Sequence, residues 1–192
     1  MGQFRFSETV LKGLVIVEPA VFGDERGFFM ETYNERDFIN AGIDAPFVQD
    51  NHSKSKKGVL RGMHFQVKRP QGKLVRVISG EVFDVAVDLR KSSPTLKKWF
   101  GTVLSADNKR QMYVPGGFAH GFLVLSESAE FVYKCTDFYD PHDELGLRYD
   151  DPAVGIAWPS TDSAPLVSEK DLALPSFDDV CGLLNLYDKN GA

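Results

Sequence analysis

Two side chains in the sequence are candidates for exchanging protons with a bound molecule. His64 lies in the apolar run 59–65, where it is either a buried histidine bonded to the backbone or a general base, because imidazole titrates near neutral pH. Tyr133 lies between Phe131 and Cys135 in a second apolar run, where it is either a core residue or a proton donor. A base and an acid on opposite sides of a pocket can invert a carbon centre, since one removes a proton and the other returns one to the opposite face.

Two further side chains could support that chemistry. Strand alternation places Lys73 on the same face as Val75 and Val77, so it is either a strand-end lysine that reaches solvent or a fixed cation facing an oxyanion. His120 follows the glycine-rich segment 115–119, and the glycines explain a tight loop but not the histidine. Together these residues predict proton abstraction beside a carbonyl, with a base, an acid and a group that stabilises the enolate oxygen.

The elements that must position these side chains are mainly strands. Short apolar runs separated by turn signals predict a β-sandwich or barrel. The expected strands are residues 14–18, 28–33, 47–53, 59–65, 73–78, 82–89, 99–104, 111–114, 119–125 and 130–136. One short helix is expected at 34–41, with Asn34 as its cap and Gly42 closing it.

The clearest strand pattern covers residues 82–89. Phe83 and Val85 share one face with the apolar residues that follow at the same period, while Asp84 and Asp88 share the other face. A period of two with acids on one face predicts a half-buried strand.

A single domain spanning residues 1–192 fits the length of the chain, because all-β domains often reach this size. The strand pattern fades after Asp140, and several prolines follow it. Residues from about 141 to 192 therefore predict a turn-rich tail that packs on the barrel, with a short helix starting near Ser168.

Composition excludes several classes of protein. The net charge of −5 argues against a nucleic-acid binder, although a small anionic ligand needs only a local cluster of cations. Cys135 and Cys181 form no CxxC pair and no disulfide framework, which fits a reduced cytoplasmic setting. The first ten residues lack the apolar core of a secretion signal, and no apolar run is long enough to cross a bilayer, so no membrane contact is expected.

Six motifs in chain order resemble those of the dTDP-4-dehydrorhamnose 3,5-epimerase family, and the likeness runs from about Phe4 to Lys170. They are Asp-Glu-Arg-Gly-Phe-Phe at 24–29, Phe-Val-Gln-Asp-Asn at 47–51, Gly-Val-Leu-Arg-Gly-Met-His-Phe-Gln at 58–66, Pro-Gln-Gly-Lys-Leu-Val-Arg-Val at 70–77, Gly-Phe-Ala-His-Gly-Phe at 117–122 and Tyr-Lys-Cys-Thr-Asp at 133–137. The resemblance implies a mainly β, cupin-type jelly-roll barrel with a few short helices, which works as a homodimer without a cofactor. It also implies inversion of C3 and C5 of dTDP-4-dehydro-6-deoxyglucose, which gives dTDP-4-dehydro-L-rhamnose for dTDP-L-rhamnose synthesis.

The resemblance also implies roles for individual residues. His64 would be the base and Asp171 the carboxylate that orients it, while Lys73 would face the C4 oxygen and Tyr133 would be the opposing acid. Tyr139 would stack on the thymine. The remaining expected substrate-binding residues are Arg26, Glu31, Gln49, Asn51, Arg61, His120, Glu144 and Lys170.

Simple alternation conflicts with one of these expectations. Arg61 and His64 are separated by an odd number of residues, so a regular strand would send them to opposite faces. Gly62 lies between them and could form a bulge or twist that turns both side chains inward. An irregularity is therefore expected at Gly62.

Many cupins hold a metal, so metal binding needs its own test. The metal-binding pattern that these proteins resemble is His-x-His followed by Glu and a later His. Here Phe65 and Gln66 follow His64, so the second histidine is missing, although His120 matches the later one. Two histidines without the other ligands make a poor transition-metal site, and we expect no bound metal.

Several alternatives stay open at this point. Within enzymes, they are a single-site 3- or 5-epimerase and a ketoisomerase, each acting on a related dTDP-4-keto sugar. A metal-dependent cupin oxygenase is disfavoured by the missing ligands. A sugar-binding cupin without catalytic activity would keep the arginines and aromatic residues but would not need His64, Lys73 and Tyr133 together.

Overall fold

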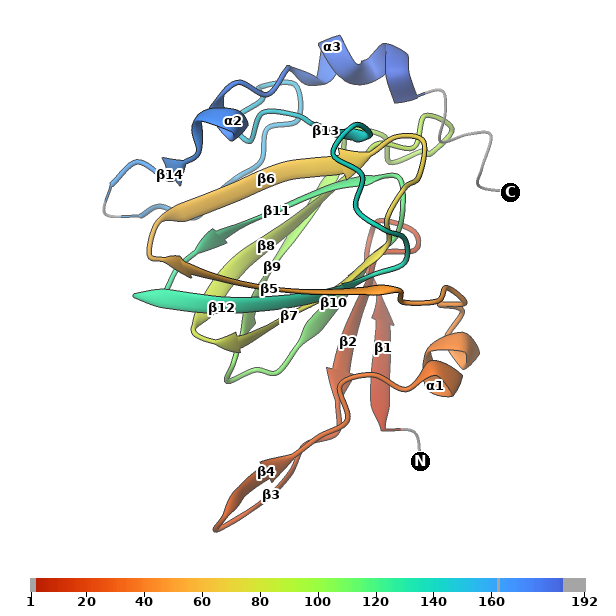
Figure 1. Ribbon diagram of the computed structural model, residues 1–192, viewed down its shortest axis with the longest axis vertical. Helices are drawn as coiled ribbons and strands as arrows, with labels where there is room; N and C mark the ends of the chain where they lie inside the picture. The colour runs from red at the N-terminus through yellow and green to blue at the C-terminus, as the bar shows by residue number, and fades with distance from the viewer. Residues whose placement is uncertain (1–2, 162, 185–192) are drawn as a thin grey trace.

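Two antiparallel sheets make up most of the computed structural model, which describes residues 3–161 and 163–184 (Figure 1). The strands of the first sheet, in spatial order, are β1 (Phe4–Glu8), β2 (Val15–Pro19), β10 (Gln111–Val114), β7 (Lys73–Ser79), β12 (Ser128–Cys135) and β5 (Gln49–Lys56). Those of the second are β13 (Glu144–Gly146), β6 (Val59–Gln66), β11 (Phe118–Val124), β8 (Glu81–Asp88) and β9 (Trp99–Ser105), with β14 (Leu166–Val167) parallel to β6. The fold is therefore mainly β, a cupin-like jelly roll as expected, with the two sheets facing each other instead of closing into a continuous barrel.

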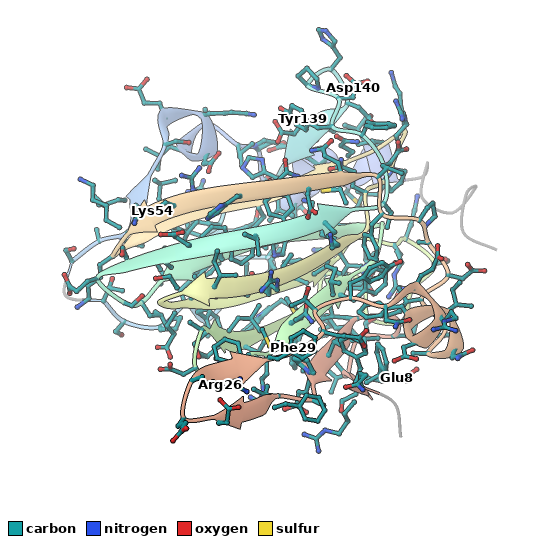
Figure 2. The ribbon with its side chains drawn as sticks, turned by 60° about the horizontal axis from the view of Figure 1, so that its bottom comes forward. Glu8, Arg26, Phe29, Lys54, Tyr139 and Asp140 are labelled. Carbon is teal, nitrogen blue, oxygen red and sulfur yellow. The ribbon has the colours of Figure 1, made fainter. Side chains whose placement is uncertain are left out.

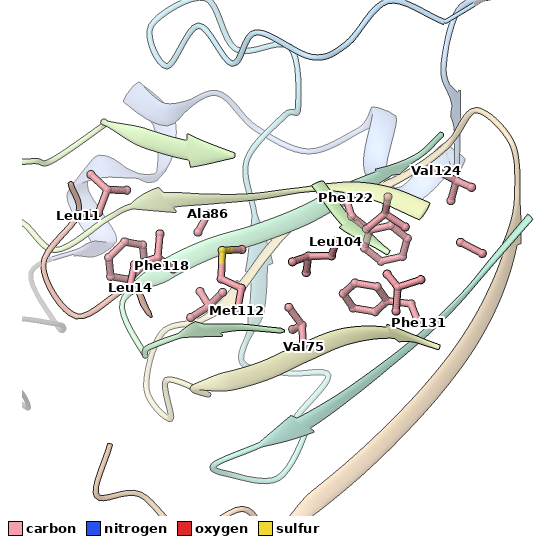
Figure 3. Close-up of a cluster of buried hydrophobic side chains, with 14 residues drawn as sticks. Leu11, Leu14, Val75, Ala86, Leu104, Met112, Phe118, Phe122, Val124 and Phe131 are labelled. Carbon is pink, nitrogen blue, oxygen red and sulfur yellow. The ribbon is translucent and has the colours of Figure 1, made fainter. Parts of the chain in front are cut away.

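The space between the sheets is filled at one end by an apolar core (Figure 3). Val75 of the first sheet and Ala86 of the second both point into it, because alternate residues of each strand face inward. Phe122 and Phe131 stack across the two sheets with ring centroids 4.3 Å apart. Burial of such aromatic side chains stabilises the sandwich.

The prediction that residues 82–89 form a half-buried strand is wrong, because both faces of β8 are buried. Asp84 and Asp88 are each 0% exposed. Phe83 and Val85, on the opposite face, pack in a second apolar cluster together with the C-terminal segment. The period of two is present, but it separates two buried environments instead of core from solvent.

The C-terminal segment covers the outer face of the second sheet (Figure 1). It contains β14 and two short helices, α2 (Glu169–Leu172) and α3 (Phe177–Val180). Ser168 caps α2 by accepting a hydrogen bond from the Asp171 backbone N–H. The helix therefore begins where the sequence predicts, near Ser168. Residues 185–192 of the expected tail lie outside the described residues.

A projecting hairpin near the N-terminus departs from the expected strand pattern. Strand β4 (Gly27–Phe29) is shorter than the expected strand 28–33, and it pairs only with β3 (Phe22–Asp24). The hairpin extends away from the two sheets (Figure 1). Its exposed residues include Phe22, Phe28 and Phe29, so apolar surface is presented away from the core.

Helix α1 (Glu35–Asn40) forms close to the expected place. Asn34 is its N-cap residue, but its side chain makes no capping bond and donates instead to Glu31 Oε1 at 3.4 Å. Gly42 follows the helix with φ +83°, a conformation that suits glycine and ends the helix as expected. In the described part of the chain, no helix is long and apolar enough to cross a membrane.

Candidate active site

A cavity of about 460 Å³ lies between the two sheets and is bordered by Phe122 and Phe131 of the apolar core. The structure brings most of the expected site residues to its wall. Those that line it are Gln49, Asn51, Arg61, His64, Lys73, His120, Tyr133, Tyr139, Glu144, Lys170 and Asp171. The mixture of carboxylates, cations, amides and aromatic rings suits a polar ligand with an anionic group.

The two sheets place the expected base and acid on facing walls. His64 belongs to β6 of the second sheet, and Tyr133 belongs to β12 of the first. In β12, Cys135 pairs with Lys73 of the neighbouring strand and Tyr133 pairs with Val75, so Lys73 and Tyr133 project from the same face of that sheet. His64, Lys73 and Tyr133 therefore line one cavity.

An irregularity at Gly62 brings Arg61 and His64 to the same cavity, as expected. The pairing of β6 with β11 shifts register between His120, which faces His64, and Phe122, which faces Arg61. Gly62 has φ +118°, and its peptide bond to the next residue is cis. Arg61 remains exposed at the cavity wall, where its Nε donates to a serine of β5 at 3.0 Å.

A buried carboxylate holds the His64 ring. Asp171 is 5% exposed, and its Oδ1 lies 3.1 Å from His64 Nε2. Its Oδ2 accepts a hydrogen bond from the Gly62 backbone N–H at 3.2 Å, so the carboxylate is tied to the strand that carries the histidine. Burial lowers the pKa of His64, and the negative charges of Asp171 and Glu144 only partly oppose that effect. The ring is therefore neutral at neutral pH, which is the form that can accept a proton.

The other ring nitrogen of His64 faces a network at the cavity mouth. Glu144 Oε1 lies 3.4 Å from His64 Nδ1, and its Oε2 accepts a hydrogen bond from the Tyr139 hydroxyl at 3.0 Å and pairs with the Lys170 ammonium. Burial acts to raise the pKa of Glu144, but Lys170 and His64 outweigh it and the pKa is lowered. Glu144 is therefore a carboxylate that links the mouth of the cavity to the expected base.

Burial also shifts the pKa values of the other two catalytic candidates, Tyr133 and Lys73. Burial raises the pKa of Tyr133, so its phenol keeps its proton at neutral pH and can donate it. Burial lowers the pKa of Lys73, while nearby Cys135, Glu144 and Asp84 act to raise it. The cavity thus combines a neutral imidazole, a protonated phenol and a buried lysine near acidic side chains.

Sequence reasoning missed Asp84 as a site residue. Its Oδ1 lies 2.9 Å from His120 Nε2 inside the molecule, where Asp84 is 0% exposed. The alternation in 82–89 suggested a polar face, but Val82 and Ala86 share that face. An acid flanked by apolar residues on its own face was the available signal that Asp84 points inward.

Arg26 and Glu31 do not reach the cavity within this chain. Arg26 lies on the β3–β4 hairpin, where it pairs with Asp24 and its side chain is 84% exposed. Figure 2 shows Arg26 at one end of the molecule and Tyr139 at the other. Glu31 lies beside α1, where it accepts a hydrogen bond from Asn34. Arg26 lies away from the cavity because its hairpin pairs with neither large sheet.

The described side chains form no group of three or more His, Cys, Asp or Glu residues placed to hold a metal ion. His64 and His120 are engaged with Asp171 and Asp84 in two separate pairs. The expectation of a metal-free site remains a prediction.

A family model, curated relatives and a solved structure all match this chain to the same kind of protein. The family model described as dTDP-4-dehydrorhamnose 3,5-epimerase matches residues 8–179. A dTDP-4-dehydrorhamnose 3,5-epimerase of Pseudomonas aeruginosa is 59% identical over 176 residues, covering 91% of this chain and 97% of the relative. One from Methanothermobacter thermautotrophicus is 55% identical over 172 residues, covering 89% and 93%. The crystal structure of dTDP-6-deoxy-D-glucose-3,5-epimerase from Legionella pneumophila, in complex with dTDP-4-keto-L-rhamnose, superposes with a TM-score of 0.91 at 49% identity, covering 94% of this chain and 97% of that one.

Proposed function

Because the chain belongs to the dTDP-4-dehydrorhamnose 3,5-epimerase family, we propose that its cavity binds a dTDP-4-dehydro-6-deoxyhexose and that His64, Lys73 and Tyr133 act on the sugar. The enzyme inverts C3 and C5 of dTDP-4-dehydro-6-deoxyglucose and forms dTDP-4-dehydro-L-rhamnose. The observation that supports the assignment of residues is that a neutral imidazole and a protonated phenol project into one cavity from facing sheets.

Inversion begins with removal of a proton next to the C4 ketone. In the proposal, neutral His64 takes the proton from C3 or C5, and the electron pair of the broken C–H bond moves onto the C4 oxygen as an enolate. The Lys73 ammonium group stabilises the negative charge that develops there. Asp171 keeps the imidazole in one orientation and stabilises the imidazolium that forms.

Reprotonation from the opposite face completes the inversion. Tyr133 donates its phenolic proton to the carbon, and the enolate electrons return to form the C–H bond and the ketone. His64 is then protonated and Tyr133 is a phenolate, so exchange with solvent restores both groups before the second centre reacts. The reaction only moves protons, and the proposal therefore assigns no step to a cofactor or metal.

The mouth of the cavity is proposed to bind the nucleotide. Tyr139 is 48% exposed there, so its ring can stack on a thymine base. Arg61 and Lys170 supply positive charge suited to a diphosphate, and Gln49 and Asn51 offer amide hydrogen bonds to the rest of the substrate. Glu144 joins the two halves of the site, since it contacts both Tyr139 and His64.

A homodimer is proposed to explain the two predicted residues outside the cavity. Phe28 is 58% exposed and Phe29 is 68% exposed on the projecting β3–β4 hairpin, and a second copy would bury this apolar surface. In that arrangement Arg26 and Glu31 would reach the partner's cavity rather than their own. We further assign the enzyme to the cytoplasm, where the free thiols of Cys135 and Cys181 would stay reduced.

Nuclear magnetic resonance of the reaction in deuterated water tests the proposed function. With dTDP-4-dehydro-6-deoxyglucose as substrate, we expect deuterium at both C3 and C5 of the product. Label at one carbon alone would replace this function by single-site epimerisation, and absence of label at both carbons would leave only sugar binding.

A further inference from the structure

A buried carboxylate behind the cavity wall takes no part in the proposed proton transfers. Asp84 lies on the interior face of β8 between Val82 and Ala86, both of which belong to the apolar core. It is 0% exposed. A buried charge of this kind costs several kcal/mol unless partners stabilise it. A structural role for Asp84 should therefore be visible in its hydrogen bonds.

Two other buried aspartates in the chain show what such a structural role looks like. Asp143 accepts hydrogen bonds from two successive backbone N–H groups after β6. Asp151 accepts the backbone N–H of Ala153 on one oxygen and that of Phe177 on the other. Both carboxylates therefore tie loops together through the backbone and use both of their oxygens.

Asp84 makes different contacts. Its Oδ1 lies 2.9 Å from His120 Nε2, and its Oδ2 is buried without a hydrogen-bond partner among the residues that the structure describes. Neither oxygen has a backbone N–H donor in that part of the chain. The only hydrogen bond that Asp84 makes there is to a side chain of the cavity wall, so its position serves the cavity and not a loop.

Asp84 also interacts electrostatically with Lys73. Burial raises the pKa of Asp84, and the nearby His120 and Lys73 oppose that rise without cancelling it. The groups that favour the ammonium form of Lys73 come from three strands, with Asp84 on β8, Glu144 on β13 and Cys135 on β12. Asp84 is thus an acid shared by two groups that can carry positive charge.

The strand register places this pair next to the proposed base. His120 of β11 pairs directly with His64 of β6, so the two imidazoles lie on adjacent strands of the second sheet. Asp84 contacts the first from β8, and Asp171 contacts the second from α2. Each pair joins an imidazole Nε2 to a buried carboxylate. The His120–Asp84 pair has the same construction as the other but lies on the side of Lys73.

We propose that Asp84 is a positioning residue for the epimerisation. It orients His120 through Nε2, so that Nδ1 is left for the sugar, and its negative charge keeps Lys73 an ammonium group. The inference rests on the proposed contact of Lys73 with the C4 oxygen. A neutral Asp84 would leave Lys73 without this counter-charge and His120 free to turn. Substrate binding would then change little, while stabilisation of the enolate would weaken.

Asp84→Asn tests the proposal, because asparagine keeps the volume and removes the charge. We expect kcat to fall roughly 10- to 100-fold, which is less than the loss typical of removing an oxyanion donor itself, with KM changing less than about threefold. The alkaline limb of the kcat profile should move to lower pH, since Lys73 loses its proton more easily without Asp84. An unchanged alkaline limb would overturn the charge role.

Asp151→Asn is the matched control, because it removes a buried carboxylate that binds only the backbone of the C-terminal segment. It should lower the melting temperature and leave the shape of the pH profile unchanged. If it moved the alkaline limb as Asp84→Asn does, the effect would belong to any loss of a buried charge and the proposal would fail.

A second measurement uses the unaltered enzyme and does not depend on folding of the variant. Nuclear magnetic resonance of ¹⁵N-labelled histidine should show His120 with a proton on Nε2 at neutral pH, as a hydrogen bond to an ionised Asp84 requires. A bare Nε2 would mean that Asp84 is protonated, and the proposal would be wrong. Failure of the proposed function is distinguishable from either result, since it would appear as absence of deuterium exchange in the unaltered enzyme.

Discussion

At the scale of single residues, the cavity contains one group that is free to accept a proton and another that holds a proton it can donate. Burial lowers the pKa of His64 and raises that of Tyr133, so each group rests in the form that its proposed step requires. The same cause acts in opposite directions because burial disfavours the charged form of either group. No transfer of a proton between the two residues is needed before the substrate binds.

Removing the base and removing the acid should have different effects. We expect His64→Ala to reduce deuterium incorporation at C3 and C5 by about 100-fold or more, because the group that accepts the proton in the proposed step is then missing. Tyr133→Phe should retain part of the exchange at the carbon that His64 deprotonates but lose correct inversion. Both rates follow from mass and proton spectra of the product in deuterated water. Full activity in both variants would contradict the two roles.

Asp171 should control the acid limb of the pH profile. Its negative charge favours the imidazolium form of His64, so Asp171→Asn lowers the pKa of His64 further. The activity that is lost on acidification should then persist to lower pH, while the maximum rate falls because the ring is less well oriented. Asp178→Asn, which removes an exposed carboxylate of α3, is the control and should leave the profile unchanged. A limb that moves to higher pH would contradict the assignment.

At the scale of elements, Gly62 is the point at which β6 changes the direction of its side chains. A Cβ atom at this position would lie 2.6 Å from Gly121 Cα and 2.8 Å from the His120 carbonyl oxygen of β11. Contacts that short force backbone to move, since neither neighbour is a flexible side chain. The close approach of β6 and β11 therefore depends on glycine at this position.

Gly62→Ala should damage stability and activity together. The added methyl group pushes β6 from β11, so Arg61 and His64 would lose their common orientation toward the cavity. Gly58→Ala is a matched control, because Gly58 has φ +78° but a Cβ there meets nothing within 4 Å. We expect the control to cost about 1 kcal/mol and to keep kcat, and Gly62→Ala to cost more and lose most of kcat. Urea unfolding and steady-state kinetics measure both, and equal effects would contradict this account of Gly62.

At the scale of the whole molecule, one chain holds the proposed catalytic groups but not every expected substrate contact. The two sheets and the C-terminal segment enclose His64, Lys73 and Tyr133, whereas Arg26 lies at the far end on the projecting hairpin (Figures 1 and 2). A second copy that buries the exposed phenylalanines of the hairpin would complete the site.

Complementation between two impaired variants tests whether Arg26 of one protomer contributes to the cavity of its partner. Arg26→Ala should raise KM, and His64→Ala should reduce activity by about 100-fold or more. If Arg26 acts in the partner's cavity, refolding the two variants together restores part of the normal kcat/KM, because one site of the mixed dimer then has both residues. Arg26→Ala and His64→Ala refolded separately are the controls. No gain on mixing would place Arg26 outside the partner's site.

The proposed place of the hairpin in the dimer interface can be tested by measuring the oligomeric state of the protein. Sedimentation should show two protomers for the unaltered chain, and Phe22→Ser with Phe28→Ser should shift the population toward one protomer. Leu166→Ser, which changes an exposed apolar residue on β14 at the other end of the molecule, should leave the mass unchanged. A stable dimer in the hairpin variant would contradict its proposed place in the interface.

Local patterns in the sequence were enough to predict most of the strands of the two sheets and the irregularity at Gly62. Alternation of apolar residues reflects the period of a strand, and an odd step between Arg61 and His64 signals a break in that period, so both are visible without any partner strand. The motifs around His64, Lys73 and Tyr133 were likewise sufficient to identify the family and its reaction.

Only the tertiary structure decided which face of a strand is solvated and which side chains meet. Asp84 alternates with Phe83 as expected, but both are covered, because the C-terminal segment packs on one face of β8 and the opposite sheet packs on the other. The contact of His64 with Asp171 joins strands and helices far apart in the chain. Such contacts depend on register between distant segments, and the period of a single strand carries no information about its neighbours.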